Sequence, residues 1–254
     1  RKKALGVEEL HMYDIYAPIA KAPSKKYSFE EAKAIVKEGL APMGEEYLSK
    51  LQEGFDNRWI DVYENEGKRS GAYSWGAYGT HPYVLLNFQG TLDHVFTLAH
   101  EMGHALHSYY SDANQTYINA GYKIFVAEVA STCNESLLIH DLLKKTKDKE
   151  TRAYLINHFL EQFKGTLYRQ TMFAEFEKIT HEMVQKGETL TADVLCETYY
   201  DLNKLYFGED IVLDKEIALE WARIPHFYNP FYVYQYATGI SAAITLSRKI
   251  MKEG

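Results

Sequence analysis

Two histidines and a glutamate in one apolar segment carry the clearest chemistry in this sequence. His100, Glu101 and His104 form an H-E-x-x-H pattern within the segment TLAHEMGHALHSYY. A helix turns about 100° per residue, so residues four apart lie roughly 40° apart on one face and about 6 Å apart along the axis. Two imidazoles at this spacing can bind one Zn²⁺ at about 2.0–2.1 Å, and Glu101 can accept a proton from a water on the metal. The pattern therefore predicts a catalytic zinc site.

The residues around this pattern predict the helix that positions it. Thr91 and Asp93 follow Gly90 and supply the cap and the first turn of a helix. Its predicted apolar residues are Leu92, Val95, Phe96, Leu98, Ala99, Met102, Ala105 and Leu106. Two histidines and a glutamate in so apolar a helix are costly unless something compensates them, which favours a metal site over an ordinary core histidine.

His107 is an alternative partner for His104 on a metal, because it lies three residues further along the same helix. That pair has no glutamate in the position of the base. We interpret His107 as a residue that supports the site or the structure around it rather than as a ligand.

A second predicted helix, over residues 121–146, supplies the remaining ligand. Catalytic zinc sites use three protein ligands and a water, so the two histidines need one more donor. Glu128 is the best candidate because it lies in an apolar run, IFVAEVA, where an unpaired carboxylate is costly. Glu135 lies two turns later on the same face and could accept a hydrogen bond from a ligand imidazole. Asp112 and His140 remain as alternative donors.

Length and composition limit the classes of partner. The 254 residues contain 46% hydrophobic residues and suit one large domain, which we predict to span residues 1–254. The net charge of −7 does not suggest a basic surface for binding nucleic acid. The sequence contains no run of about eighteen apolar residues that would predict a membrane span. Cys133 and Cys196 form no C-x-x-C motif, so we expect neither a disulfide framework nor a thiolate zinc site. These features favour a reducing, cytoplasmic location.

Helical patterns lie on both sides of one strand-rich region. A capping box at Ser28 and Glu31 predicts the start of a helix. Further helices are predicted over residues 43–53 and 151–186, and strands over residues 12–16, 59–63 and 82–88. The strand at 82–88, PYVLLNF, leads into the metal helix. It could pair with an extended peptide through a free edge, or it could be an ordinary core strand, and the sequence leaves both open.

A tyrosine-rich stretch near the C-terminal end, IPHFYNPFYVYQYATG, is the last with possible chemistry. It contains His226 together with Tyr228, Tyr232, Tyr234 and Tyr236. Tyrosines at this density often reflect buried amphipathic packing. Alternatively, a phenol or imidazole here donates a hydrogen bond to the oxyanion of a tetrahedral intermediate.

Three blocks together resemble a known family. The blocks GAYSWGAYGTHPYVLLNFQGTLDHVFTLAHEMGHALHSYYS, FVAEVASTCNESLL and IPHFYNPFYVYQYATG are similar to oligoendopeptidase F, of the thimet-oligopeptidase-like zinc metallopeptidases. The resemblance implies a mainly α, zincin-type catalytic domain with a small antiparallel sheet beside the helical core. Chains of the family are longer at the N-terminus and enclose a channel for short peptides. This sequence is therefore expected to be the catalytic part, with a missing N-terminal part of the same polypeptide as its partner.

The resemblance also implies roles for particular residues. His100, His104 and Glu128 would bind one Zn²⁺ per chain, and Glu101 would be the general base. His226 and a tyrosine of the 232–236 cluster would stabilise the oxyanion. Tyr234 is favoured for that role, with Tyr232 and Tyr228 as the alternatives.

The residues together with the resemblance imply a zinc endopeptidase that hydrolyses oligopeptides. A zinc carboxypeptidase or aminopeptidase on a similar scaffold is the alternative enzyme, and it would need a fixed charge for a peptide terminus. Arg69, Arg169 and Arg223 could supply that charge for a carboxylate. A non-catalytic zinc-binding or peptide-binding protein is the other alternative, against which Glu101 argues, because a structural site has no use for a base.

Overall fold

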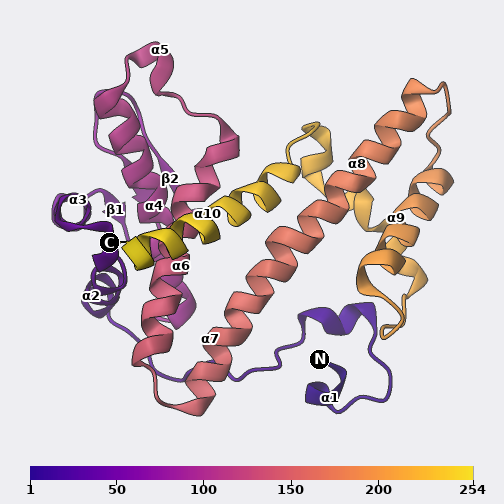
Figure 1. Cartoon of the computed structure of the whole chain (residues 1–254), viewed down its shortest axis with the longest axis horizontal. Coiled ribbons are helices and arrows are strands. Elements are labelled where there is room, and N and C mark those ends of the chain that lie inside the picture. The colour runs from indigo at the N-terminus through magenta and orange to yellow at the C-terminus, as the bar shows by residue number, and fades with distance from the viewer. Residues whose placement is uncertain (254) are drawn as a thin grey trace. The chain divides into compact units, whose positions relative to one another are not determined.

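The computed structural model describes residues 1–253 and divides into two compact units (Figure 1). Unit 1 contains Arg1–Lys21 and Ile156–Ala237, and unit 2 contains Ala22–Leu155 and the chain from Thr238 onward. The chain passes between the units after Lys21, within helix α7 (Lys149–Gln162) and within helix α10 (Tyr234–Glu253). The single catalytic domain expected over residues 1–254 stays a prediction, and the units are described separately below.

Unit 2 is mainly helical, as predicted. Its helices, besides the parts of α7 and α10, are α2 (Phe29–Gly39), η2 (Ala41–Met43), α3 (Glu45–Asp56), α4 (Leu92–Asn114), α5 (Tyr117–Ala120) and α6 (Ile124–Lys145). The predicted caps are confirmed. Thr91 Oγ1 accepts a hydrogen bond from His94 N at the start of α4, and Ser28 and Glu31 form the capping box of α2. Capping therefore fixes where both helices begin.

Helices α4 and α6 form the core of unit 2 and approach each other closely. A Cβ atom at Gly103 of α4 would lie 2.6 Å from Cα of Ser131 and 3.0 Å from the carbonyl oxygen of Ala130, both in α6. Asn134 Nδ2 also donates to the carbonyl oxygen of Ala99 at 3.0 Å, in a buried position. Glycine thus lets two backbones meet at the level of the H-E-x-x-H pattern.

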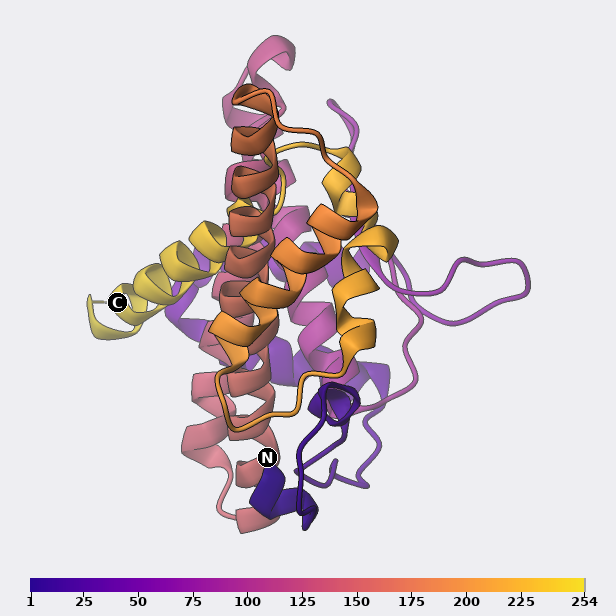
Figure 2. The same cartoon turned by 90° about the vertical axis from the view of Figure 1, so that its right-hand side faces the viewer.

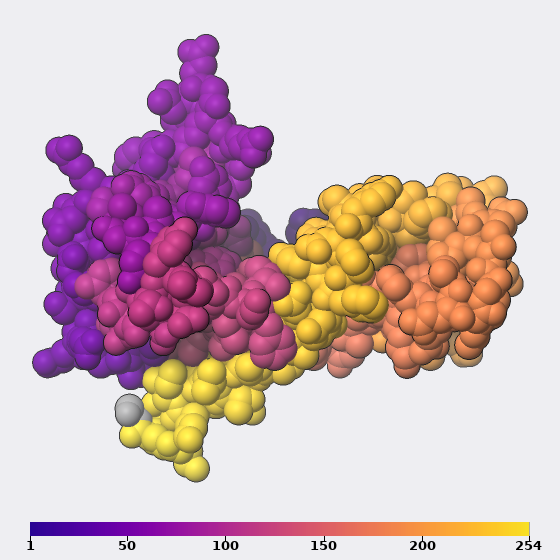
Figure 3. Space-filling model, turned by 90° about the horizontal axis from the view of Figure 1, so that it is seen from above, coloured from indigo at the N-terminus to yellow at the C-terminus, as the bar shows by residue number. Residues whose placement is uncertain are grey.

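The sheet of unit 2 is small and mixed. Its strands are β1 (Ile60–Asp61), β2 (Tyr73–Trp75) and β3 (Tyr83–Leu85), in the order β1-β3-β2. The expected antiparallel pairing holds for β2 and β3, whereas β1 pairs with β3 in parallel. The predicted strand at 82–88 is therefore the central one, paired on both sides, and the alternative that it offers a free edge to a peptide is wrong. The loops between the strands project from the helices of this unit, as the purple segments of Figures 2 and 3 show.

Unit 1 is helical and packs around aromatic side chains. Its elements are α1 (Lys2–Leu5), η1 (Met12–Tyr16), a π-helical segment η3 (Phe163–Tyr168), α8 (Arg169–Gln185), α9 (Ala192–Phe207), η4 (Lys215–Arg223) and η5 (Pro225–Tyr228). Helices α8 and α9 lie side by side (Figure 2). Their shared core contains Met172, Phe173, Phe176, Tyr199, Leu202, Ile224 and Val233. The predicted helix or helix pair over 151–186 is one run of α7, η3 and α8.

The segment predicted as a strand at 12–16 is instead the 3₁₀ helix η1, so that prediction is wrong. His11 and Asp14 form a capping box at its start, and local capping outweighs the strand pattern of MYDIY. None of the helices within residues 1–253 combines the length and the apolarity needed to span a lipid bilayer.

Candidate metal centre

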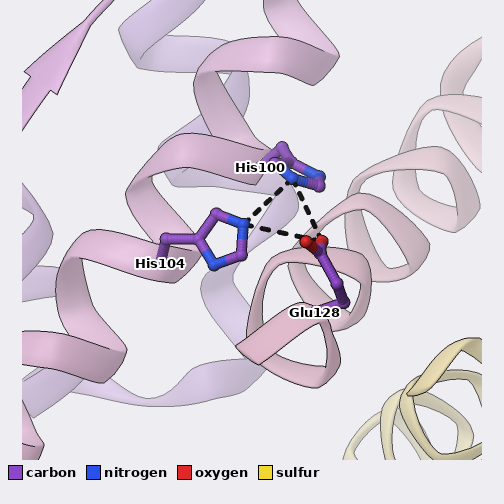
Figure 4. A group of neighbouring side chains, drawn as sticks. All are labelled: His100, His104 and Glu128. Carbon is purple, nitrogen blue, oxygen red and sulfur yellow. Dashed lines mark hydrogen bonds and ion pairs between the residues drawn. The ribbon is translucent and has the colours of Figure 1, made fainter. Parts of the chain in front are cut away.

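Three donor groups from two helices of unit 2 converge on one point. His100 and His104 come from α4 and Glu128 comes from α6, and one ligand atom of each lies within 4.8 Å of the others (Figure 4). The two Nε2 atoms are 3.1 Å apart, and each lies 3.5 Å from Oε2 of Glu128. The structure therefore brings together the three residues that the sequence singled out as metal ligands.

These distances fit a tetrahedral ion. Donor atoms bound to one tetrahedral metal at about 2.0–2.2 Å are roughly 3.3–3.6 Å apart. The three observed separations, 3.1, 3.5 and 3.5 Å, lie close to this range. Two imidazole nitrogens and a carboxylate oxygen are also donors that suit zinc and leave a fourth position open.

Glu135 fixes the ring of His100. Nδ1 of His100 donates to Oε1 of Glu135, so its Nε2 faces His104 and Glu128. Burial lowers the pKa of His100, but the hydrogen bond and the charge of Glu135 outweigh burial and raise it to about 9. This confirms the predicted contact between Glu135 and a candidate ligand imidazole, and it is the arrangement that fixes both tautomer and orientation.

Glu128 is held in place by its own helix. Ser131 Oγ donates to Oε2 of Glu128 at 3.1 Å. Burial raises the pKa of the Glu128 carboxyl, but the hydrogen bond and charge of His104, with those of His100 and Ser131, lower it overall. A carboxylate that stays ionised is a suitable metal ligand.

Glu101 is buried beside these donors and belongs to none of their contacts. It is 6% exposed, and its Oε2 has no hydrogen-bond partner within the described part of the chain. Burial raises the pKa of its carboxyl, partly offset by the charges of His100 and His104. A buried carboxylate oxygen without a partner is costly, and its presence here points to a group that the site is built to receive.

A cleft of about 1110 Å³ opens over this centre within unit 2. Its residues come from β2, the loop after β2, one face of α4, the α5 segment and the start of α6. The cleft is lined by residues 72–76, Tyr78, His100, Glu101, His104, Ser108, Asp112, Tyr117, Ile118, residues 120–122, Ile124, Ala127 and Glu128. Strand β2 lies at an edge of the sheet, so the strand edge beside the metal centre belongs to β2.

The alternative donors are not part of the donor group. Nδ1 of His140 is engaged by the carbonyl oxygen of Ser136 at 2.6 Å. The ring of His107 stacks on that of Tyr122, with centroids 3.8 Å apart. Asp112 lines the same cleft but lies outside the group of three donors. Tyr122, whose hydroxyl contacts Ser108 Oγ at 2.9 Å, is a lining residue that the sequence analysis did not identify.

The histidine and the tyrosines of the tyrosine-rich stretch lie in unit 1, where Tyr234 and Tyr236 belong to the first turn of α10. The ring of His226 stacks on Tyr232 at 5.7 Å and meets the edge of Tyr236 at 6.2 Å. The hydroxyl of Tyr236 donates to that of Tyr232 at 3.1 Å. Tyr234 begins α10 and is 43% exposed. His226 thus makes its ring contacts with Tyr232 and Tyr236.

The chain that carries this donor group at the H-E-x-x-H helix matches a known family over its whole length. The sequence model that describes Peptidase family M3 matches residues 1–254, so the chain belongs to that family. The relationship implied by the sequence blocks is therefore confirmed at the level of the family.

Several relatives are similar over nearly the whole chain. Oligopeptidase PepF of Bacillus subtilis is 58% identical over 254 residues, which are 100% of this chain and 38% of that protein. The chromosomal oligoendopeptidase F of Lactococcus lactis is 50% identical over 99% of this chain and 42% of its own length.

Two solved structures are similar as well. A crystal structure of a putative peptidase from Chlamydophila abortus has a TM-score of 0.88 and 46% identity, and covers 99% of this chain and 42% of that one. The oligoendopeptidase-F structure from Enterococcus faecium has a TM-score of 0.73 and 40% identity, over 99% and 37% of the two chains. The chain thus spans about two fifths of the length of these relatives.

The close approach at Gly103 makes a prediction about metal affinity. In Gly103→Ala the new methyl group meets the backbone of α6, and overpacking of this kind typically costs about 1–3 kcal/mol. We expect α6 to move away from α4, so that Glu128 leaves the two histidines and zinc affinity falls. Competition with a chelating dye and thermal unfolding measure the two effects.

Gly239→Ala is the matched control for this substitution. A Cβ atom at Gly239 would make an ordinary contact with Cβ of Glu128 at 3.7 Å, so zinc affinity should be kept. Unchanged zinc affinity and unchanged unfolding temperature in Gly103→Ala would show that the close approach of α4 and α6 does not determine zinc binding.

Proposed function

We propose that this chain forms the catalytic part of a zinc-dependent endopeptidase that hydrolyses oligopeptides. The observation that carries the proposal is the group of three donors, His100, His104 and Glu128, beside the buried carboxylate of Glu101, whose Oε2 has no partner among the described residues, in one cleft. A structural metal site needs no such carboxylate, whereas hydrolysis needs a base next to the metal. Membership of Peptidase family M3 supports the same class of reaction.

Different residues of the chain bind the metal and transfer the proton. His100, His104 and Glu128 hold one zinc ion, and Glu135 orients His100. When bound, the ion lowers the pKa of a water and polarises the carbonyl of the scissile bond. Glu101 accepts the proton of the attacking water and then passes it to the leaving amine. Burial raises the pKa of the Glu101 carboxyl, which makes it a stronger base than an exposed carboxylate.

The resemblance of the tyrosine-rich stretch to the family supports His226 and Tyr234 as the donors of hydrogen bonds to the oxyanion. We expect Tyr234→Phe to lower kcat by about 10²–10³-fold with little change in KM, because such a bond strengthens mainly in the transition state. Steady-state kinetics on a blocked peptide measure both constants. If the loss appears in Tyr232→Phe or Tyr228→Phe and not in Tyr234→Phe, the donor has been assigned to the wrong ring.

The distinction between internal and terminal cleavage depends on a fixed charge for a peptide terminus. Among the described residues that line the cleft of unit 2 there is no lysine or arginine. Two of the arginines considered for that role, Arg169 and Arg223, are bound by Glu220 in unit 1. These contacts argue against a carboxypeptidase, which would need a cation for the C-terminal carboxylate.

A peptide blocked at both ends tests the proposed function. Zinc-dependent cleavage within the acetylated and amidated peptide is the expected result. Cleavage confined to peptides with a free terminus would favour the carboxypeptidase or aminopeptidase alternative, and zinc binding without any cleavage would favour a non-catalytic protein. The cytoplasmic location and the contribution of a further N-terminal part stay predictions.

A further inference from the structure

One face of α4 lines the cleft with a residue in every fourth position. His100, His104, Ser108 and Asp112 all belong to the lining. Asp112 is eight residues beyond His104, which is about 12 Å along the helix axis at a rise of about 1.5 Å per residue. An extended peptide advances roughly 3.3 Å per residue, so this distance corresponds to about three or four residues from the metal centre.

The carboxylate of Asp112 has no opposite charge to offset it. It makes no ion pair or hydrogen bond with any residue in the described range 1–253. A divalent ion held by the histidines and Glu128 would offset the charges of Glu128 and Glu101 and leave that of Asp112. Because no lysine or arginine lines the described part of the cleft, the site presents a net negative charge at this end.

Asp112 also lies at the unfavourable end of its helix. It is in the last turn of α4, which ends at Asn114 and contains no basic residue. The carbonyl groups of a last turn carry about half a negative charge, so an acidic side chain there destabilises the helix. The two negative charges together form a site that a cation would stabilise.

Two tyrosine rings lie near the last turn of α4. The hydroxyl of Tyr78 donates to the carbonyl oxygen of Gln115, three residues after Asp112, at 3.0 Å. The rings of Tyr78 and Tyr117 meet edge to face with centroids 5.5 Å apart. Tyr117 is 74% exposed, and both rings line the cleft. Aromatic rings that line the same cleft as a carboxylate suit the aliphatic stem and the charged head of a lysine or arginine side chain.

We propose that Asp112, with Tyr78 and Tyr117, binds a lysine or arginine side chain of the substrate, three or four residues from the scissile bond. Asp112 is a specificity-determining residue in this assignment, and the inference rests on the proposed peptidase function. The carboxylate of Asp112 would pair with the positive charge of the substrate side chain at the C-terminal end of α4. The rings of Tyr78 and Tyr117 would cover the stem of that side chain.

The test uses peptides blocked at both ends, each with a single lysine, glutamate or alanine at one position on either side of the cleavage site. We expect the wild-type protein to prefer lysine over glutamate at one position, three or four residues from the scissile bond. Asp112→Asn should reduce this ratio of kcat/KM values about fivefold to tenfold, and Asp112→Lys should invert it. The preference should weaken at high salt, because the pair is partly exposed.

Two further measurements test the role of Asp112 without depending on turnover. Binding of the same peptides to Glu101→Gln, with and without Asp112→Asn, should show the same loss of preference. The unfolding temperature should rise slightly in Asp112→Asn, because a charge is removed from the negative end of α4. Asp56→Asn is the matched control, since Asp56 ends α3, lies outside the cleft and changes the net charge equally. It should leave the preference unchanged.

The outcomes separate this inference from the proposed function. An equal lysine-to-glutamate ratio in the wild-type protein and in Asp112→Asn would overturn the inference, as would a preference spread over all positions. Absence of cleavage for every peptide, with charge-dependent binding retained, would overturn the peptidase function and keep the cation site.

Discussion

Glu101→Gln is expected to abolish nearly all turnover while keeping the fold and the metal. General acid–base groups contribute about 10²–10⁴-fold, and Glu101 acts on both the attacking water and the leaving amine, so a loss of about 10³–10⁴-fold in kcat is expected. The amide is nearly isosteric with the carboxyl, and the side chain touches none of the three candidate ligands through a hydrogen bond. Zinc content and unfolding temperature should therefore stay close to those of the wild-type protein.

The measurement is single-turnover cleavage of a blocked peptide, combined with metal analysis of the same preparation. Glu30→Gln serves as control, because its side chain is 80% exposed and pairs with Lys33 of its own helix. Near-normal activity in Glu101→Gln would remove this residue from the role of base. Loss of zinc in the same variant would show instead that Glu101 contributes to the metal site.

Removal of any one of the three donors should release the metal. His100→Ala, His104→Ala and Glu128→Ala each leave two donors, and we expect equimolar zinc to be lost during dialysis, which metal analysis measures directly. Glu135→Gln should cause a smaller loss of about 10–100-fold in affinity, because Glu135 only orients His100.

His140→Ala is the control for the donor series, because His140 is engaged by the backbone of its own helix. It should keep one zinc per chain. Undiminished zinc in Glu128→Ala would contradict the assignment of the third ligand and favour Asp112, Glu135 or His140.

The local parts of this structure could be predicted from the sequence. The cap at Thr91 and the apolar run after it predicted α4, and the apolar setting of Glu128 indicated α6. The spacing of four residues between His100 and His104 fixes their shared face, because helix geometry is independent of the rest of the fold. The partner role of Glu135 followed from its spacing of seven residues from Glu128.

The parts that depend on distant contacts could not be predicted in this way. A three-residue strand such as β2 has too few residues for a pattern, and its place at the sheet edge depends on pairing with β3. The parallel partner β1 is equally short. The role of Gly103 appears only when α4 and α6 are packed, since its close neighbours belong to another helix. The unpaired charge of Asp112 likewise depends on the tertiary structure, because no basic side chain of the described residues forms an ion pair with it.

Locating the metal itself is the strongest test of the zinc assignment. A crystal of the zinc-loaded protein, measured on both sides of the zinc absorption edge, should give one anomalous peak between Nε2 of His100, Nε2 of His104 and Oε2 of Glu128. The expected distances are about 2.0–2.2 Å from each donor, with Glu101 outside the ligand set. A peak at any other group of residues, or a fully loaded protein without density at these three donors, would show that His100, His104 and Glu128 do not hold the metal.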